Sequence, residues 1–169
     1  QFQNFVLELE WKVSKGGNSG IFYLAKETAV RKEDGSLKYQ PIYISAPEYQ
    51  LLDNANHPDA KLGVDGNRKS SSLYDMIPAK PQNSKPWGEW NKVKIVVKDG
   101  KVTHYQNGKK VLSYEMWNAK WRKMVDDSKF GSSKWPIAYE LLTTKHDGYI
   151  GLQDHGDVVW YKNIKVKEL

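Results

Sequence analysis

The N-terminal segment alternates between apolar and polar positions, which is the pattern of a half-buried β-strand. One face of the segment carries apolar side chains only: Phe5, Leu7, Leu9, Trp11 and Val13. The other face carries Val6, Glu8, Glu10 and Lys12. Because successive side chains of a strand point to opposite faces, a period of two predicts a strand over residues 5–13 with one face in a core.

Further short apolar runs, each bounded by turn residues, predict more strands. They lie at Ile21–Ala25, Ile42–Ile44, Glu48–Leu52, Gly148–Gln153 and Val158–Lys167. The charged segment 27–40 contains Asp34-Gly35 and predicts a loop or an exposed hairpin. Over residues 115–125, Trp117, Trp121 and Met124 recur at helical spacing. That spacing predicts one short helix, which we expect to pack on the rim of the strands rather than to present a functional aromatic stripe.

The most regular segment predicts a three-stranded meander over residues 92–114. Its strands are separated by Asp99-Gly100 and Asn107-Gly108. These pairs suit type I′ hairpin turns, in which both central residues need a positive φ. Many short strands with turn signals and little helix predict an all-β, two-sheet antiparallel sandwich. At 169 residues, the chain fits a single domain over residues 1–169.

Composition restricts the possible chemistry without selecting one function. The chain contains 7 Trp and 10 Tyr, which can fill a sandwich core or form platforms for sugars. Trp87, Trp90 and Trp160 are candidates for stacking on a pyranose ring. The absence of cysteine excludes disulfide scaffolds, Cys-zinc sites and thiol catalysis.

The formal net charge of +6 raises the question of a nucleic-acid partner. The lysines are spread along the chain, and the densest stretch, residues 120–123, is followed at once by Asp126-Asp127. We therefore expect a solvated basic surface and no nucleic-acid partner. No apolar run approaches the ~20 residues of a membrane span. No signal peptide is apparent, because Gln1 leads almost directly into the first strand, as in a mature or truncated protein.

The first candidate site cluster lies on the strand 48–52. Glu48 and Gln50 point to the same face of this strand and can hydrogen-bond adjacent sugar hydroxyls, although a solvent-facing pair has the same spacing. The long connection 54–72 that follows is typical of functional loops.

The second cluster is Gly151–Gly156. Gln153 and His155 share a face if the strand continues, and a His at this position suits acid–base work near neutral pH. Glu10 and Lys12, on the polar face of the first strand, either join the same concave surface or face water. Nucleophile-elbow, phosphate-loop and zinc-protease motifs are absent.

An ordered set of motifs covers nearly the whole chain. It consists of Asn18–Tyr23, Glu48–Asn54, Gly88–Asn91, His104 with Asn107-Gly108, Gly151–Gly156 and Asn163-Ile164. In this order the motifs resemble the 3-keto-disaccharide hydrolase domain family. The resemblance implies a jelly-roll sandwich of the concanavalin A-like lectin and glucanase type. It also implies cleavage of glycosides oxidised at C3, and export to a periplasmic or extracellular location.

The same resemblance implies that Glu48, Gln50, Asp53 and His155 lie near the cleft. Family domains normally begin further upstream, so one or more N-terminal strands are expected to precede Gln1. Two positions depart from the family pattern: Leu24 and Lys162 stand where Arg is usual. Neither residue reproduces the planar, bidentate donor that Arg supplies, so we expect altered substrate contacts.

We therefore predict an enzyme that cleaves 3-keto-glycosides or disaccharides, with a carbohydrate as its partner. Glu48 and His155 are the candidate catalytic residues, and either one can be the base or the acid. Candidate substrate-binding residues are Glu10, Lys12, Tyr23, Gln50, Asp53, Tyr74, Gln153 and Lys162. A divalent cation at Glu48, Asp53 or His155 is compatible with these residue types, but no ligand spacing requires one.

Two alternatives remain open at this point. The first is a non-catalytic, lectin-like carbohydrate-binding module, because the same fold serves lectins. The second is a retaining or inverting glycosidase, which needs two carboxylates about 5–5.5 Å or ~6.5–9.5 Å apart. Glu10 and Glu48 are the candidate pair for that mechanism.

Overall fold

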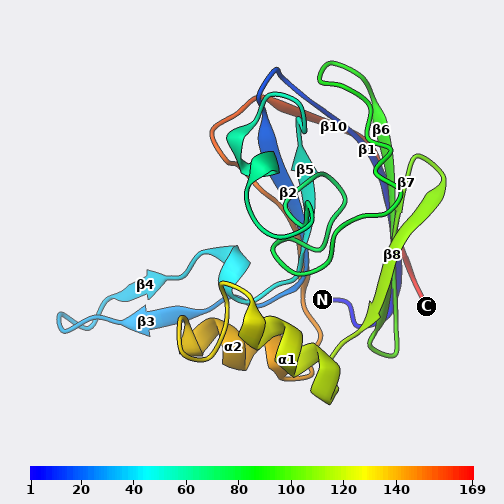
Figure 1. Ribbon diagram of the computed structural model, residues 1–169. Coiled ribbons are helices and arrows are strands. Elements are labelled where there is room, and N and C mark those ends of the chain that lie inside the picture. Colours follow the sequence, from blue (N-terminus) through cyan, green and yellow to red (C-terminus); the bar gives the residue numbers. More distant parts are fainter.

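Two antiparallel sheets form a β-sandwich in the computed structural model, which describes all residues 1–169 (Figure 1). The five-stranded sheet has the order β10-β1-β6-β7-β8, and the three-stranded sheet has the order β5-β2-β9. Their bounds are β1 (Phe5–Val13), β2 (Asn18–Ala25), β5 (Glu48–Leu52), β6 (Asn91–Lys98), β7 (Lys101–Gln106), β8 (Lys109–Glu115), β9 (Tyr149–Leu152) and β10 (Val159–Glu168). The predicted two-sheet sandwich is confirmed.

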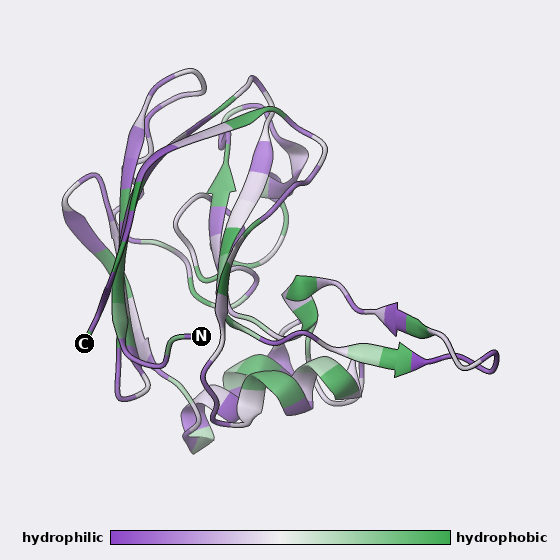
Figure 2. Ribbon diagram, turned by 180° about the vertical axis from the view of Figure 1, so that it is seen from behind, coloured by the Kyte–Doolittle hydropathy of each residue, from purple (hydrophilic) through white to green (hydrophobic).

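Smaller elements lie outside the two sheets. They are the hairpin strands β3 (Ala29–Arg31) and β4 (Leu37–Tyr39), the short 3₁₀ helices η1 (Ile42–Ile44) and η2 (Pro58–Lys61), and the helices α1 (Ala119–Asp127) and α2 (Pro136–Thr143). The β3–β4 hairpin projects away from the sandwich in both Figure 1 and Figure 2. Neither α1 nor α2 combines the length and the apolar character that crossing a membrane requires.

The meander has the turns that the sequence predicts. Asp99 and Gly100 have φ values of 50° and 79°, and Asn107 and Gly108 have values of 49° and 81°. Positive φ at both central residues is the requirement of a type I′ turn, whose twist matches that of the flanking strands. The local chemistry of these four residues therefore sets the register of β6, β7 and β8.

Two predicted elements differ from the structure. Residues 42–44 form the 3₁₀ helix η1 rather than a strand, because the Ser45 N–H turns back to the Ile42 carbonyl oxygen at 3.1 Å. Helix α1 begins at Ala119 rather than at 115, because the Asn118 side chain caps it by accepting from the Trp121 N–H at 2.8 Å. Helix α2 has no counterpart among the predicted elements.

The core lies between the sheets, as the alternation in β1 indicates. Leu7 and Trp11 of the five-stranded sheet and Ile21 and Leu51 of the three-stranded sheet belong to one buried cluster. Trp121 of α1 is fully buried in the same cluster, and its indole N–H donates to the Leu142 carbonyl at 2.8 Å. This Trp therefore packs the helix and is not part of a functional stripe.

Tyr23 belongs to a polar chain inside this core and not to a sugar cleft, contrary to the prediction. Its hydroxyl bonds to His104 Nε2 at 2.8 Å and to the Tyr114 hydroxyl. His104 Nδ1 lies 3.1 Å from the Ser71 carbonyl, which can only accept, so Nε2 accepts from Tyr23. Burial lowers the pKa of His104 to about 4, which keeps the ring neutral.

Removing the Tyr23 hydroxyl is expected to destabilise the fold without affecting a surface site. The Tyr23→Phe change leaves His104 Nε2 buried without a donor, at a cost of about 1–3 kcal/mol in the free energy of unfolding. Urea denaturation measures this cost. Tyr39→Phe is the matched control, because Tyr39 is 67% exposed. Equal unfolding midpoints for the two variants would contradict the structural role.

Candidate functional site

An open cavity of about 440 Å³ lies on the outer face of the three-stranded sheet. It is lined by Asn18, Tyr43, Glu48, Gln50, His57, Pro58, Asp59, Leu62, Tyr74, Lys129, Gln153 and His155. Of the ten residues that the sequence singles out as a site, five line this cavity: Glu48, Gln50, Tyr74, Gln153 and His155. The cavity therefore brings both sequence clusters together.

The strands β5, β2 and β9 form the polar floor of the cavity. Glu48 and Gln50 of β5 point into it, because the intervening Tyr49 belongs to the core between the sheets. Asn18 opens β2, and Gln153 directly follows β9, where its N–H donates to the Gly20 carbonyl at 2.9 Å.

Two side-chain amides of this floor have unused hydrogen-bonding capacity. Asn18 Oδ1 and Gln153 Oε1 are buried without a partner. Buried polar groups are normally paired, so these two oxygens beside one cavity are free to accept hydrogen bonds from a bound ligand. Sugar hydroxyls are donors of this kind. Asn18 is a site residue that the sequence did not reveal.

Among the carboxyl groups that line the cavity, that of Glu48 has the most strongly shifted pKa. Its residue is only 9% exposed, and no hydrogen bond from the protein stabilises its carboxyl group. Burial raises its pKa to about 8; the charge of Lys129 opposes this increase, and that of Asp59 adds to it. A carboxyl group with this pKa exchanges its proton near neutral pH, as a general acid or base must.

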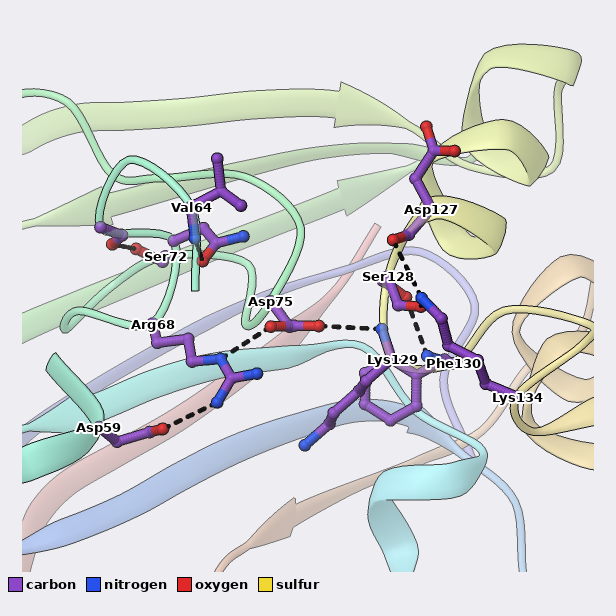
Figure 3. Close-up of polar contacts among 12 residues, drawn as sticks. Asp59, Val64, Arg68, Ser72, Asp75, Asp127, Ser128, Lys129, Phe130 and Lys134 are labelled. Carbon is purple, nitrogen blue, oxygen red and sulfur yellow. Dashed lines mark hydrogen bonds and ion pairs between the residues drawn. The ribbon is translucent and has the colours of Figure 1, made fainter. Parts of the chain in front are cut away.

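Lys129 supplies a cation to the cavity. The sequence analysis did not predict it as a site residue. Its backbone N–H donates to Asp75 Oδ2 at 2.9 Å, and its ammonium lies 4.3 Å from the centre of the Tyr74 ring. Burial lowers its pKa, and the negative charge of Glu48 opposes that shift. Figure 3 shows the Lys129 side chain extending away from Asp75, with no partner drawn at its ammonium. The cation is therefore available to a ligand.

An ion-pair network fixes the wall that carries Lys129 (Figure 3). The Arg68 guanidinium lies between two carboxylates, 2.7 Å from Asp75 Oδ1 and 3.0 Å from Asp59 Oδ1. Asp75 in turn holds the Lys129 backbone. The long connection 54–72, which the sequence predicts as a functional loop, therefore supplies Asp59 and Arg68, and Asp75 links them to the segment after α1 at the same cavity.

Two histidines stand at the cavity. His155 is exposed in the loop between β9 and β10, where the Gly156 N–H donates to Asp154 Oδ1 at 2.9 Å and tightens the turn. His57 precedes η2, and its Nδ1 accepts from the Asp59 N–H at 3.1 Å. The neutral form of His57 therefore carries its proton on Nε2. Both rings line the cavity, where they can contact a ligand.

Asp53 has a local structural role and does not line the cavity, contrary to the expectation from the resemblance. Its carboxylate accepts from the Gly16 N–H at 2.8 Å, from the Asn56 side chain at 2.7 Å and from the Ala55 N–H at 3.1 Å. Burial acts to raise its pKa, but these hydrogen bonds outweigh burial and hold the pKa below its usual value. Asp53 thus fixes the turn after β5.

Glu10, Lys12 and Lys162 lie on the other side of the sandwich, so Glu10 and Lys12 do not join the concave surface, and none of the three lines the cavity as a candidate substrate-binding residue. Glu10 Oε1 accepts from Asn163 at 2.8 Å, and its Oε2 lies 3.7 Å from the Lys162 ammonium. Because alternate residues of β1 point into the core, Glu10 and Lys12 must point away from it. Glu10 and Glu48 therefore cannot flank one glycosidic bond.

The three residues considered for a divalent cation do not come together. The Asp53 carboxylate is occupied by the hydrogen bonds of its turn, while Glu48 and His155 line the cavity. No group of three or more His, Asp and Glu side chains is arranged to hold a metal ion.

Gly20 leaves the space that the Glu48 carboxyl group occupies. A Cβ at position 20 would lie 2.9 Å from Glu48 Cδ and closer still to Oε1. We expect Gly20→Ala to displace the carboxyl group and to lower any cavity-dependent turnover by about tenfold or more, since small misplacements of a catalytic group have large effects. Steady-state kinetics measure this loss. Gly151→Ala is the control, because there the added methyl group meets the tip of Ile42 instead. Equal activity of both variants would contradict the assigned geometry.

Sequence comparison finds relatives over the whole chain. Residues 1–167 match the family described as the 3-keto-alpha-glucoside-1,2-lyase-like domain. A curated Bacteroides thetaiotaomicron protein named 3-keto-disaccharide hydrolase is 61% identical over 173 aligned positions. The alignment covers 100% of this chain and 60% of that relative, so the chain spans less than two thirds of the relative's length.

Structural comparison finds the same sandwich in crystal structures of candidate glycosyl hydrolases from Parabacteroides distasonis. One has a TM-score of 0.80 at 28% identity, covering 99% of this chain and 73% of the other. A second has a TM-score of 0.68 at 26% identity, covering 99% of this chain and 79% of the other.

Proposed function

Since this chain belongs to the 3-keto-alpha-glucoside-1,2-lyase-like domain family, we propose that its cavity cleaves glycosides whose sugar ring carries a ketone at C3. The observation that carries the proposal is Glu48, a buried carboxyl group with a pKa of about 8 in the same cavity as the cation of Lys129. A proton-transfer group beside a cation is the pair that an elimination next to a ketone requires.

The chemistry follows from the acidity of the proton at C2, which the neighbouring ketone increases. Glu48 in its ionised form takes this proton, and the electron pair of the C2–H bond forms an enolate with the C3 oxygen. Collapse of the enolate makes a C1–C2 double bond and breaks the bond from C1 to the leaving group. Addition of water across the double bond returns a hydroxyl to C1 and a proton to C2, so the net reaction is hydrolysis.

The other cavity residues have roles that their positions favour. The Lys129 ammonium stabilises the negative charge of the enolate oxygen, because its partial burial strengthens the attraction. His155 protonates the departing oxygen from the loop after β9. The amides of Asn18, Gln50 and Gln153 hold the ring hydroxyls, and the Tyr74 ring packs beside the substrate.

One experiment separates this enzyme from a lectin-like binding module. The protein is incubated with a 3-keto-glucoside and with its unoxidised parent, and release of the leaving group is followed by chromatography. We expect cleavage of the keto form only, and a slower reaction when the C2 hydrogen is replaced by deuterium. Binding of either sugar without cleavage would overturn the proposal and support the module.

The finer fold class and the location are also proposals. We place the sandwich in the concanavalin A-like class on the basis of its two antiparallel sheets and its motif order. The family resemblance supports a periplasmic or extracellular location. Fractionation of the producing cells, with the protein detected in the cytoplasmic fraction alone, would overturn that location.

A further inference from the structure

The outer face of the five-stranded sheet concentrates the positive charge of the protein. The edge strand β10 places Lys162, Lys165 and Lys167 on this face, and β6 adds Lys92, Lys94 and Lys98 at alternate positions. Strands β1, β7 and β8 contribute one lysine each. Figure 2 shows hydrophilic segments along the strands of this sheet.

This concentration is larger than the sequence indicates. Only three carboxylates share the face, namely Glu8, Glu10 and Glu115, so its surplus of positive charge equals the formal net charge of +6 of the whole chain. The lysines are dispersed in sequence, but strands bring residues from β1, β6 and β10 to within one or two strand spacings of about 4.8 Å. Such a face attracts polyanions.

A groove on this face provides a place for an extended ligand. It has a volume of about 570 Å³, and its lining includes Glu8, Glu10, Lys94, Tyr105 and Lys165. The Lys94 ammonium lies 5.2 Å from the centre of the Tyr105 ring. Lysines, carboxylates and an aromatic ring therefore alternate within a single concave surface.

Aromatic side chains lie beside the groove toward the start of β10. Trp160 is 42% exposed, and the Lys12 ammonium lies 4.7 Å from its ring and 5.1 Å from the ring of Trp90. The Lys162 ammonium lies 4.0 Å from the Trp90 ring. Cation–π contacts hold these indoles on the surface, where a ring face suits stacking against a sugar.

We propose that this second surface binds an acidic polysaccharide, whose sulfate or carboxylate groups pair with the lysines while its sugar rings stack on Trp160. The groove also contains Glu8 and Glu10, which repel phosphate, sulfate and carboxylate groups alike but accept hydrogen bonds from sugar hydroxyls. A DNA backbone offers no hydroxyl donor along its length, so these carboxylates favour the polysaccharide. The surface is separated from the Glu48 cavity by both sheets and binds its ligand independently of cleavage.

The test measures binding of dextran sulfate, polygalacturonate, neutral dextran and a DNA duplex by affinity electrophoresis at low and moderate salt. We expect at least one acidic polysaccharide to be retarded more strongly than DNA, neutral dextran to be weaker than both, and the retardation to decrease with salt. Absence of polysaccharide binding would overturn the proposal. Equal or tighter binding of DNA would overturn the proposal and indicate that the surface binds a nucleic acid instead.

Two double variants with the same change in charge locate the binding. Lys94→Gln with Lys165→Gln is expected to weaken polysaccharide binding at least tenfold, and Trp160→Ala to weaken it severalfold. Lys120→Gln with Lys145→Gln removes two exposed lysines outside the sheet and is expected to leave binding nearly unchanged. Equal losses of binding in the two double variants would show that only net charge matters and would overturn the assignment of binding to the groove. Cleavage of a 3-keto-glucoside, measured in parallel, reports on the other cavity alone.

Discussion

Glu48→Gln is expected to lower the turnover of a 3-keto-glucoside by about 10²- to 10⁴-fold, the usual contribution of a general base. The amide keeps the size and burial of the side chain but cannot accept the C2 proton. Single-turnover kinetics at saturating substrate measure the change in the chemical step. A variant with the wild-type rate would remove Glu48 from the mechanism.

The pH dependence of the wild-type rate gives an independent check. In the proposed mechanism only ionised Glu48 can act as the base, and burial raises its pKa to about 8. Because removal of the C2 proton is the step expected to limit the rate, the rate of cleavage is expected to increase with pH up to about 8 and then to level off. A rate that levels off near the usual pKa of a carboxyl group would contradict the assignment.

The stability of the same variant shows whether a lost rate reflects unfolding. The pKa of Glu48 is about 8 in the folded protein and close to 4.5, the ordinary value of a glutamate, in the unfolded chain, so folding disfavours ionisation. The folded state therefore binds more protons than the unfolded state between these values, and wild-type stability falls as pH rises from about 5 to about 8. The glutamine side chain of the variant does not ionise. We expect Glu48→Gln to be more stable than wild type at pH 8, with the difference disappearing near pH 4.

Lys129→Met is expected to lower the same turnover by about 10²- to 10³-fold, the effect of removing one donor that stabilises a developing oxyanion. Methionine retains much of the packing against Tyr74 and Phe130 but has no charge. Because Lys129 lowers the pKa of Glu48, its removal is also expected to shift the pH profile of the rate to higher pH.

The profile shift distinguishes an electrostatic role of Lys129 from a structural one. Lys120→Met, an exposed position in α1, is the matched control and is expected to keep the wild-type rate and profile. Loss of rate in Lys129→Met with an unchanged profile and a lowered unfolding midpoint would indicate that Lys129 only supports the wall of the cavity.

Much of the fold was predictable because its signals are local. The alternation in β1 and the Asp-Gly and Asn-Gly turns depend on neighbouring residues only, and both are confirmed. The segment 42–44 was misassigned because a short apolar run fits a strand or a buried turn equally well. Helix α2 has no capping side chain that would have marked its start.

The site was predictable only in part, because only some of its residues carry a local signal in the sequence. Glu48 and Gln50 are two residues apart in β5, so strand periodicity places both on one face. Strand β9 ends at Leu152, so Gln153 and His155 lie in the loop that follows it, and the loop rather than strand periodicity brings both to the cavity. Lys129 carries no such signal. Its place in the cavity depends on Asp75 and Arg68, which hold its backbone from another part of the chain.

The sequence by itself determined the β-sandwich and its two polar clusters, because periodicity and turn chemistry are properties of neighbouring residues and the order of motifs can be read along the chain. The tertiary structure alone decided which of its two outer surfaces each polar residue occupies. Alternation along β1 shows that Glu10 and Lys12 point away from a core, but it cannot show which sheet the strand joins. Sheet pairing therefore separated them from Glu48, and it also collected dispersed lysines into one basic face.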